Sequence, residues 1–251
     1  MFSRRSTYRL LWILVLLLGV AAFATPQGLP IPNVQIGPQG SKDPNQVSSS
    51  LQILALLTIL SLAPAIMMLT TAFTRIVIIF SMLRTAIGTQ NIPPNQVVIG
   101  LSLFLTFYVM APTYEKINTK AIQPYMNKKI SVDEAIKQAQ APLREFMLKN
   151  TYKSDLKMFL DAREEKATEK TVSLISLTPA FVISELKTAF IVGFYMFIPF
   201  IIIDLIVASI LMSLGMMMMP PSVVSLPAKV LVFILADGWS VVVSAILSGY
   251  K

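Results

Sequence analysis

The sequence predicts an all-α membrane protein in which two long, kinked hydrophobic helical hairpins flank a small extracytoplasmic helical domain. The first observation is the composition, since 55% of the 251 residues are hydrophobic and the mean hydropathy is +0.68. The second is that the apolar residues form runs as long as the roughly 20 residues a membrane-spanning helix needs. The third is that the charged residues gather in one internal segment between those runs.

Several classes of function lack their usual residues in this chain. It contains no Cys and no His, which excludes a disulfide framework and most zinc, haem and Ser-His-Asp sites. We find no Walker A loop and no GxGxxG fingerprint, so we expect no cofactor and no enzyme. The formal net charge is +8, but the basic residues do not alternate with aromatic ones, so no nucleic-acid partner is expected.

Residues 1–24 resemble a cleavable signal peptide. A basic start precedes an apolar run, and Ala22 and Ala24 have the small–x–small spacing of a cleavage site. The run is short for a retained first transmembrane helix, which is the alternative. Residues 25–50 are rich in Pro, Gly, Gln, Asn and Ser, which predicts a flexible extracytoplasmic tail beginning at Thr25 in the mature chain.

Residues 51–112 form the first predicted hairpin. Its outgoing part is longer than one span, and Pro64 and the polar pair Thr70-Thr71 predict a kinked or broken helix. Arg75 lies within this apolar run, where a charge normally faces protein or water rather than lipid.

The returning half of this hairpin follows a turn over residues 88–96. Asn95 is the expected cap of the returning helix, residues 97–111, and Pro112 is expected to end it. The hairpin is therefore predicted to cross the membrane twice.

Residues 113–177 differ in composition, with twelve Lys/Arg and nine Asp/Glu. Their helical periodicity predicts a small soluble helical domain. Ser131 to Glu134 have the form of a capping box, Pro142 suits the first turn of a second helix, and Asp155 can start a third. Its carboxylates indicate a solvated helix face rather than an acid–base pair.

Residues 178–251 form the second predicted hairpin. Thr178 and Pro179 are expected to begin a long apolar helix with a kink at Pro199. A final span is predicted as one helix over residues 228–247.

Charged residues interrupt this apolar hairpin. Lys229 and Asp237 lie eight residues apart, on a similar side of one helix but about 12 Å apart along its axis, so each needs a partner elsewhere. Glu185 and Lys187 are two residues apart and cannot face each other. Structural ion pairing and a direct transport role both remain open, and we interpret the set as intramembrane charges for assembly: Arg75, Glu185, Lys187, Asp204, Lys229 and Asp237.

Four consecutive methionines, Met216, Met217, Met218 and Met219, occupy the turn of the second hairpin. Gly215 precedes them and two prolines follow. Methionine is flexible and polarizable, so the run predicts a soft apolar surface that repacks around what touches it. An apolar loop buried in the core is the alternative.

The topology follows from the signal peptide. Its basic end stays in the cytoplasm, so four crossings place residues 84–96 and the Met turn inside and residues 113–177 outside. Arg75 and Arg84 beside the first inner turn agree with the positive-inside rule.

Long stretches of the chain resemble the FliP/SctR family of type III secretion export-gate proteins, and these stretches are FTRIVIIFSMLRTAIGTQNIPPNQVVIGLSLFLTFYVM, LTPAFVISELKTAF, IPFIIIDLIVASILMSLGMMMMPP and SLPAKVLVFILADGW. The resemblance covers nearly all of residues 51–112 and 178–247. The signal peptide and long tail resemble the flagellar branch.

The resemblance implies a pore-forming subunit of the flagellar export gate in the bacterial inner membrane, at the flagellar basal body. Members form the core of the gate with the partner proteins FliQ and FliR. Several copies, a pentamer in the family, surround a pore for unfolded flagellar subunits. The family's Met-rich loop, which corresponds to Met216–Met219, seals that pore. The main rival is a secondary transporter or ion channel with a charge relay through Arg75, Asp204, Lys229 and Asp237.

Overall fold

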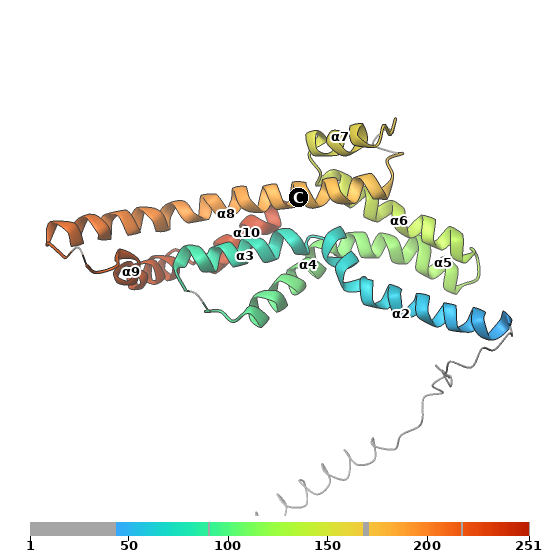
Figure 1. Ribbon diagram of the computed structural model, residues 1–251, viewed down its shortest axis with the longest axis horizontal. Helices are drawn as coiled ribbons and strands as arrows, with labels where there is room; N and C mark the ends of the chain where they lie inside the picture. Colours follow the sequence, from blue (N-terminus) through green and yellow to red (C-terminus); the bar gives the residue numbers. More distant parts are fainter. Residues whose placement is uncertain (1–43, 90, 168–170, 217, 251) are drawn as a thin grey trace, which may run out of the picture. The chain divides into compact units, whose positions relative to one another are not determined.

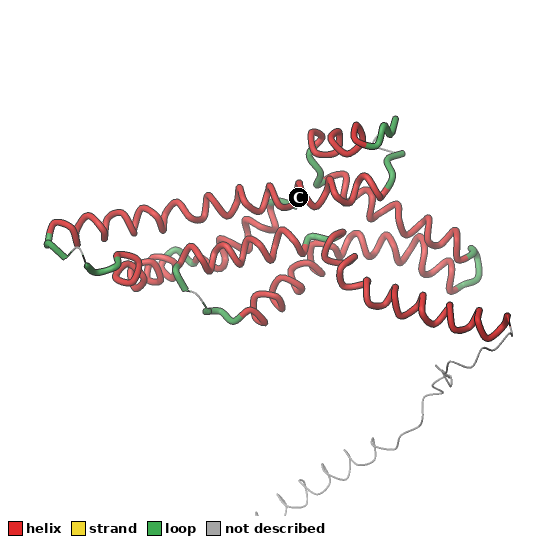
Figure 2. The backbone as a smooth tube through the Cα atoms, viewed as in Figure 1, coloured by secondary structure: helices red, strands yellow, loops and turns green. Residues whose placement is uncertain are grey.

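The computed structural model describes residues 44–89, 91–167, 171–216 and 218–250. These residues form helices joined by short loops, with no strand among them (Figures 1 and 2). The all-α prediction is confirmed. The expected signal peptide, with Ala22 and Ala24, lies outside the described residues, as do Met217 and most of the expected tail. The chain divides into two compact units, Met1–Ile59 and Leu60–Lys251, and only the second contains the sites described below.

The elements follow one another in this order: α2 (Pro44–Thr70), α3 (Phe73–Ile87), α4 (Asn95–Ile117), the π-helical turn η1 (Asn118–Ile122), α5 (Gln123–Met126), α6 (Val132–Lys149), α7 (Lys153–Ala162), α8 (Leu174–Ser213), α9 (Pro221–Leu235) and α10 (Gly238–Ser248). Helix α2 begins at Pro44 rather than at Leu51, so the last part of the expected tail is helical.

Two stretches among the described residues are long and apolar enough to cross a membrane, Asn95–Met126 and Leu174–Ser213. Two further pairs of helices would qualify if each bent pair counts as one span. These are Ile53–Leu62 with Pro64–Thr70, bent by 42°, and Pro221–Leu235 with Gly238–Ser248, bent by 64°. The expected interruption of the first span at Pro64 and at Thr70-Thr71 therefore agrees with the structure.

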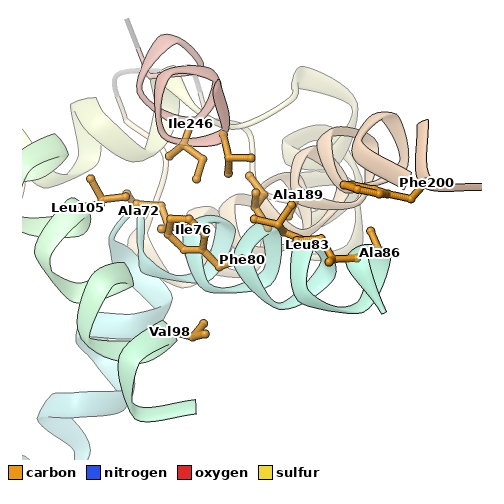
Figure 3. Packing of buried hydrophobic residues seen from close by; sticks show 13 residues of the cluster. Ala72, Ile76, Phe80, Leu83, Ala86, Val98, Leu105, Ala189, Phe200 and Ile246 are labelled. Carbon is orange, nitrogen blue, oxygen red and sulfur yellow. The ribbon is translucent and has the colours of Figure 1, made fainter. Parts of the chain in front are cut away.

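The main hydrophobic core is built around α3. Its apolar residues recur every three or four positions, as in Ile76, Phe80 and Leu83, and so they form one buried face. Figure 3 shows this face between side chains of α4, α8 and α10. Gly193 lets α8 approach α3 closely, because a Cβ there would lie 2.3 Å from the sulfur of Met82.

A second core joins the charged segment to the start of α8. Met147 and Leu156 from α6 and α7 are buried against Leu177 and Phe181 of α8. The expected boundaries at 112 and 177 fall inside α4 and α8, respectively. The charged segment consequently shares its core with α8.

Several expected helix ends are wrong. α4 continues through Pro112, and α6 contains Pro142 in its interior. Both helices thus tolerate the backbone hydrogen bond that a proline removes. α8 begins at Leu174, capped by Ser173, whose hydroxyl accepts from the Ser176 N–H at 3.3 Å. The predicted cap at Thr178 therefore lies inside the helix.

Other local signals were read in part correctly. Ser131 caps α6 as predicted, since its hydroxyl accepts from the Glu134 N–H at 3.3 Å. Asn95 instead begins α4, and its side-chain oxygen accepts from Arg84. α7 starts at Lys153, near the expected place, and ends at Ala162. α8 continues through Pro199 as one helix, so the kink expected there stays a prediction.

The final span is not one helix, which corrects the prediction for residues 228–247. α9 ends at Leu235 and α10 begins at Gly238 after a 64° bend. Asp237 has the left-handed φ of 48°, and a Cβ on Gly238 would lie 2.2 Å from the ring of Phe233. The close approach of this ring requires glycine. Lys229 and Asp237 therefore lie on separate helices.

Candidate functional site

A buried ion pair joins α3 to α8. The Arg75 guanidinium donates to Glu185, and no part of Glu185 is exposed. Arg75 also donates to the carbonyl of Gly249 at 3.2 Å. A buried charge is tolerated only when it is paired and hydrogen-bonded, so these contacts explain how Arg75 sits within an apolar segment.

Tyr250 completes this cluster. Its hydroxyl donates to the second carboxylate oxygen of Glu185 at 2.6 Å, and its ring centroid lies 4.1 Å from the guanidinium carbon of Arg75. The same ring stacks on Phe146 of α6, with centroids 6.1 Å apart. The residues that follow α10 thus connect α3, α6 and α8 around one buried charge pair.

Two residues further along α8, Lys187 pairs with the charged segment. Its ammonium donates to Asp155 of α7 at 2.8 Å, and Ser184 donates to the other carboxylate oxygen of Asp155 at 2.8 Å. The hydrogen bond from Lys187 lowers the pKa of Asp155 below its usual value, with Ser184 adding to the effect. Glu185 and Lys187 therefore each reach a different helix.

A third ion pair lies toward the far end of α8. Lys229 of α9 donates to Asp204 at 2.6 Å, and Ser225 donates to the other oxygen of the same carboxylate. Lys229 and Ser225 are buried. The Asp204 side chain keeps 35% of its surface exposed, so this carboxylate remains open to a neighbour.

Asp237 has a different environment. It is exposed at the bend between α9 and α10, and among the described residues it has no ion-pair partner. Its carbonyl accepts from the Val241 N–H at 3.2 Å, which starts α10. A carboxylate at this position is available to a cation from outside the chain.

The turn between α8 and α9 presents the methionines on a defined backbone. Gly215 has the left-handed φ of 73°. Its N–H bonds to the Met212 carbonyl at 3.1 Å, and the Met216 N–H bonds to the Leu211 carbonyl at 3.0 Å. These two bonds are the Schellman arrangement that ends helices at glycine. Pro220 and Pro221 then begin α9.

The described methionine side chains of this turn, those of Met216, Met218 and Met219, point away from the core. Met216 and Met219 are exposed over about two-fifths of their surface, 41% and 42%, and Met218 is fully exposed. In the single chain, therefore, this turn is not an apolar loop buried in the core.

Comparison with known proteins identifies the family. The model of the FliP family matches residues 56–246. The flagellar biosynthetic protein FliP of Bacillus subtilis (strain 168) is 53% identical over 84% of this chain and 96% of its own length. The FliP protein of Aquifex aeolicus (strain VF5) is 49% identical over 80% of this chain and 86% of its own.

The chain belongs to the FliP family. Another relative, FliP of Buchnera aphidicola subsp. Baizongia pistaciae (strain Bp), is 41% identical over all of this chain and 69% of its own length. Together with the apolar helices, this membership makes the chain a membrane protein of the flagellar export apparatus that acts in flagellum biogenesis with other export components.

Some residues that complete the site in this FliP-family chain were not singled out from the sequence. Tyr250, Ser225 and Ser184 each hydrogen-bond a carboxylate, and Asp155 was noted only as a helix start. The signal for Asp155 was that Lys187 required a partner on another element. Within the described residues no group of three or more acidic side chains could hold a metal ion.

Proposed function

We propose that this chain is a pore-forming subunit of the flagellar export gate, with the Met turn as the seal of the pore. Several copies, a pentamer in the family, surround a channel for unfolded flagellar subunits. The exposed methionines on a fixed turn are the single observation that carries this proposal. They support it because the seal of the pore must open around peptides of varied sequence. A turn with a defined backbone and flexible apolar side chains can do so.

An apolar ring closes a pore without a charged filter. Water leaves a narrow apolar constriction, and ions then cannot cross it. Met216, Met218 and Met219 would supply such a ring when several copies bring their turns to one axis. Met217 belongs to the same run.

The intramembrane charges are proposed to act in assembly. Arg75 and Glu185 neutralise each other inside the chain, which fixes α8 against α3. Asp204 is partly exposed and Asp237 is exposed, so these two carboxylates are the ones available to neighbouring subunits. These contacts favour assembly over a transport relay through all of these charges. Arg75 is buried against Glu185, and Asp204 pairs separately with Lys229.

The partners and location are proposed from the family. FliQ and FliR are the expected neighbours, and the bacterial inner membrane at the flagellar basal body is the expected place. The charged segment, residues 113–177, is expected in the periplasm. Cleavage after Ala24 would leave Thr25 as the first residue of the mature chain, and N-terminal sequencing of the membrane-inserted protein tests this.

The test of the seal is the simultaneous replacement of Met217, Met218 and Met219 by alanine. Assembly should persist, because no buried polar group loses a partner, whereas small ions should leak through the wider closed pore. The measurement is membrane conductance in cells that make the variant. A variant with Met126→Ala and Met158→Ala removes exposed methionines from the charged segment and should leave the membrane tight. A triple-alanine protein that assembles and does not leak would refute the seal.

A further inference from the structure

An apolar cavity of about 500 Å³ lies among α3, the 88–94 turn, α4 and α9. Its volume is within the range of about 300–1,000 Å³ that is usual for small-molecule sites. Apart from Arg84 and Thr89, its lining is apolar, with Leu83, Val97 and Phe233 among the residues that form the wall. The export function described above does not use this cavity.

A single cation lies among the residues that line it. Arg84 donates from Nη1 to the side-chain oxygen of Asn95 and to the carbonyl of Pro93, the latter at 3.4 Å. Both acceptors are neutral, and in the part of the chain that the structure describes no carboxylate pairs with Arg84. A guanidinium has five N–H donors, so Nε and Nη2 remain for an anionic ligand. The positive charge of Arg84 beside the apolar wall therefore favours an anionic ligand.

The position of the cavity along the helices indicates the source of that anion. α3 ends at Ile87, and Asn95 begins a stretch long enough and apolar enough to span a membrane, so we expect the turn between them at a membrane boundary. Trp239 also lines the cavity, and tryptophan is enriched at the level of lipid headgroups. Basic pockets between membrane helices bind anionic lipid headgroups.

We propose that this cavity binds an anionic phospholipid, with an acyl chain against the apolar wall and the phosphate on Arg84. A neighbouring cavity gives the contrast. It measures about 490 Å³, shares Leu83 and Phe233 with the first, and has no charged residue in its lining. An acyl chain could occupy this second cavity, but no charged side chain there would contact the lipid headgroup. Arg84 therefore makes the first cavity selective for an anionic lipid.

The experiment uses the assembled membrane complex, purified in mild detergent and stripped of lipid. Phosphatidylglycerol or phosphatidylethanolamine is added in mixed micelles, and native mass spectrometry measures the bound lipid. The parent protein should retain phosphatidylglycerol in preference to phosphatidylethanolamine. Arg84→Gln should weaken phosphatidylglycerol binding about fivefold, the effect of about 1 kcal/mol for one basic residue at a membrane surface. Arg84→Lys should retain most of it, and Arg163→Gln, which changes an arginine outside the cavity, should have no effect.

A second variant tests the wall without changing the charge. Val97 is exposed at 53% and lines the cavity, so Val97→Trp should fill it and reduce the retention of phosphatidylglycerol while the complex still assembles. Equal binding of the two lipids by the parent, or unchanged binding by Arg84→Gln, would overturn the proposal. So would a photo-crosslinker at position 97 that reacts only with protein, because a neighbouring helix would then occupy the cavity. None of these outcomes depends on the seal at the Met turn.

Discussion

The two ion pairs that α8 makes within the apolar part of the chain differ in how completely they are enclosed. At Glu185 both partners are buried, and Tyr250 and Gly249 supply further hydrogen bonds. At Asp204 the lysine is buried, while 35% of the carboxylate side chain is exposed. The first pair is complete within one chain, and the second leaves the Asp204 carboxylate partly exposed.

This difference separates a structural role from an assembly role. Removing one member of an enclosed pair leaves an uncompensated charge in low dielectric, which is strongly destabilising. Removing one member of a partly exposed pair leaves a charge that water or a neighbouring subunit can still stabilise. The enclosed pair should therefore control the stability of the chain, and the open pair should respond to the partner.

The largest effect is expected for Glu185→Leu. It leaves Arg75 buried without its carboxylate and should cost about 3–5 kcal/mol of stability. Thermal unfolding in detergent and the amount of folded protein in membranes measure this. Glu115→Leu changes an exposed glutamate and should be nearly neutral.

A double variant checks the cause of that loss. Adding Arg75→Met to Glu185→Leu removes the unpaired charge and should restore much of the stability, because apolar replacement of a whole buried pair is often neutral or stabilising. If the double variant is no more stable than Glu185→Leu alone, the buried charge is not the reason for the loss.

A smaller effect is expected for Lys229→Met, about 1–3 kcal/mol, because Asp204 then loses its cation but keeps the hydrogen bond from Ser225 and access to solvent. The same unfolding measurement applies, in the isolated chain and in the assembled complex. The loss should be smaller in the complex if a neighbour contacts Asp204. A loss as large as that of Glu185→Leu would mean that exposure does not distinguish the two pairs.

The smallest effect concerns the pair between Lys187 of α8 and Asp155, which lies on α7 in the charged segment. The Lys187 side chain is 47% exposed, so the pair is screened and should contribute less than about 1 kcal/mol. The hydrogen bond from Lys187 lowers the pKa of Asp155 in the folded protein. The contribution of the pair to stability is therefore present above the unfolded pKa of about 4, and it is lost as the pH falls through the lower folded pKa. Unfolding measured between pH 6 and pH 3 should show this loss in the parent and not in Asp155→Asn.

The local features of the fold were the easiest to predict from the sequence. Gly215 and the run after it predicted the turn, and Ser131 predicted the start of α6. Both depend on residues a few positions apart, whose geometry the backbone alone determines. The prolines at 112 and 142 were wrong signals of helix boundaries, because both helices continue through the one backbone hydrogen bond that a proline removes.

Features that depend on residues far apart in the sequence were harder to predict. The apolar pattern continues on both sides of Asp237, so it could not predict the bend, where Asp237 has a left-handed φ and the Phe233 ring packs against Gly238. Because a charge in an apolar run needs a partner, the sequence predicted partners for Glu185 and Lys229. It could not select Arg75 and Tyr250 for Glu185, because that choice depends on how α3, α8 and the residues after α10 pack.

The central claim, that the Met turns of several copies meet at one axis, can be measured directly by cysteine crosslinking. The chain contains no cysteine, so Met218→Cys introduces a single thiol on the fully exposed side chain of the turn. The account predicts that mild oxidation of membranes with assembled complexes gives disulfide-linked dimers of this variant. Met158→Cys, an exposed position on α7, should give none. Complexes that assemble normally but give no dimer through position 218 would contradict the account.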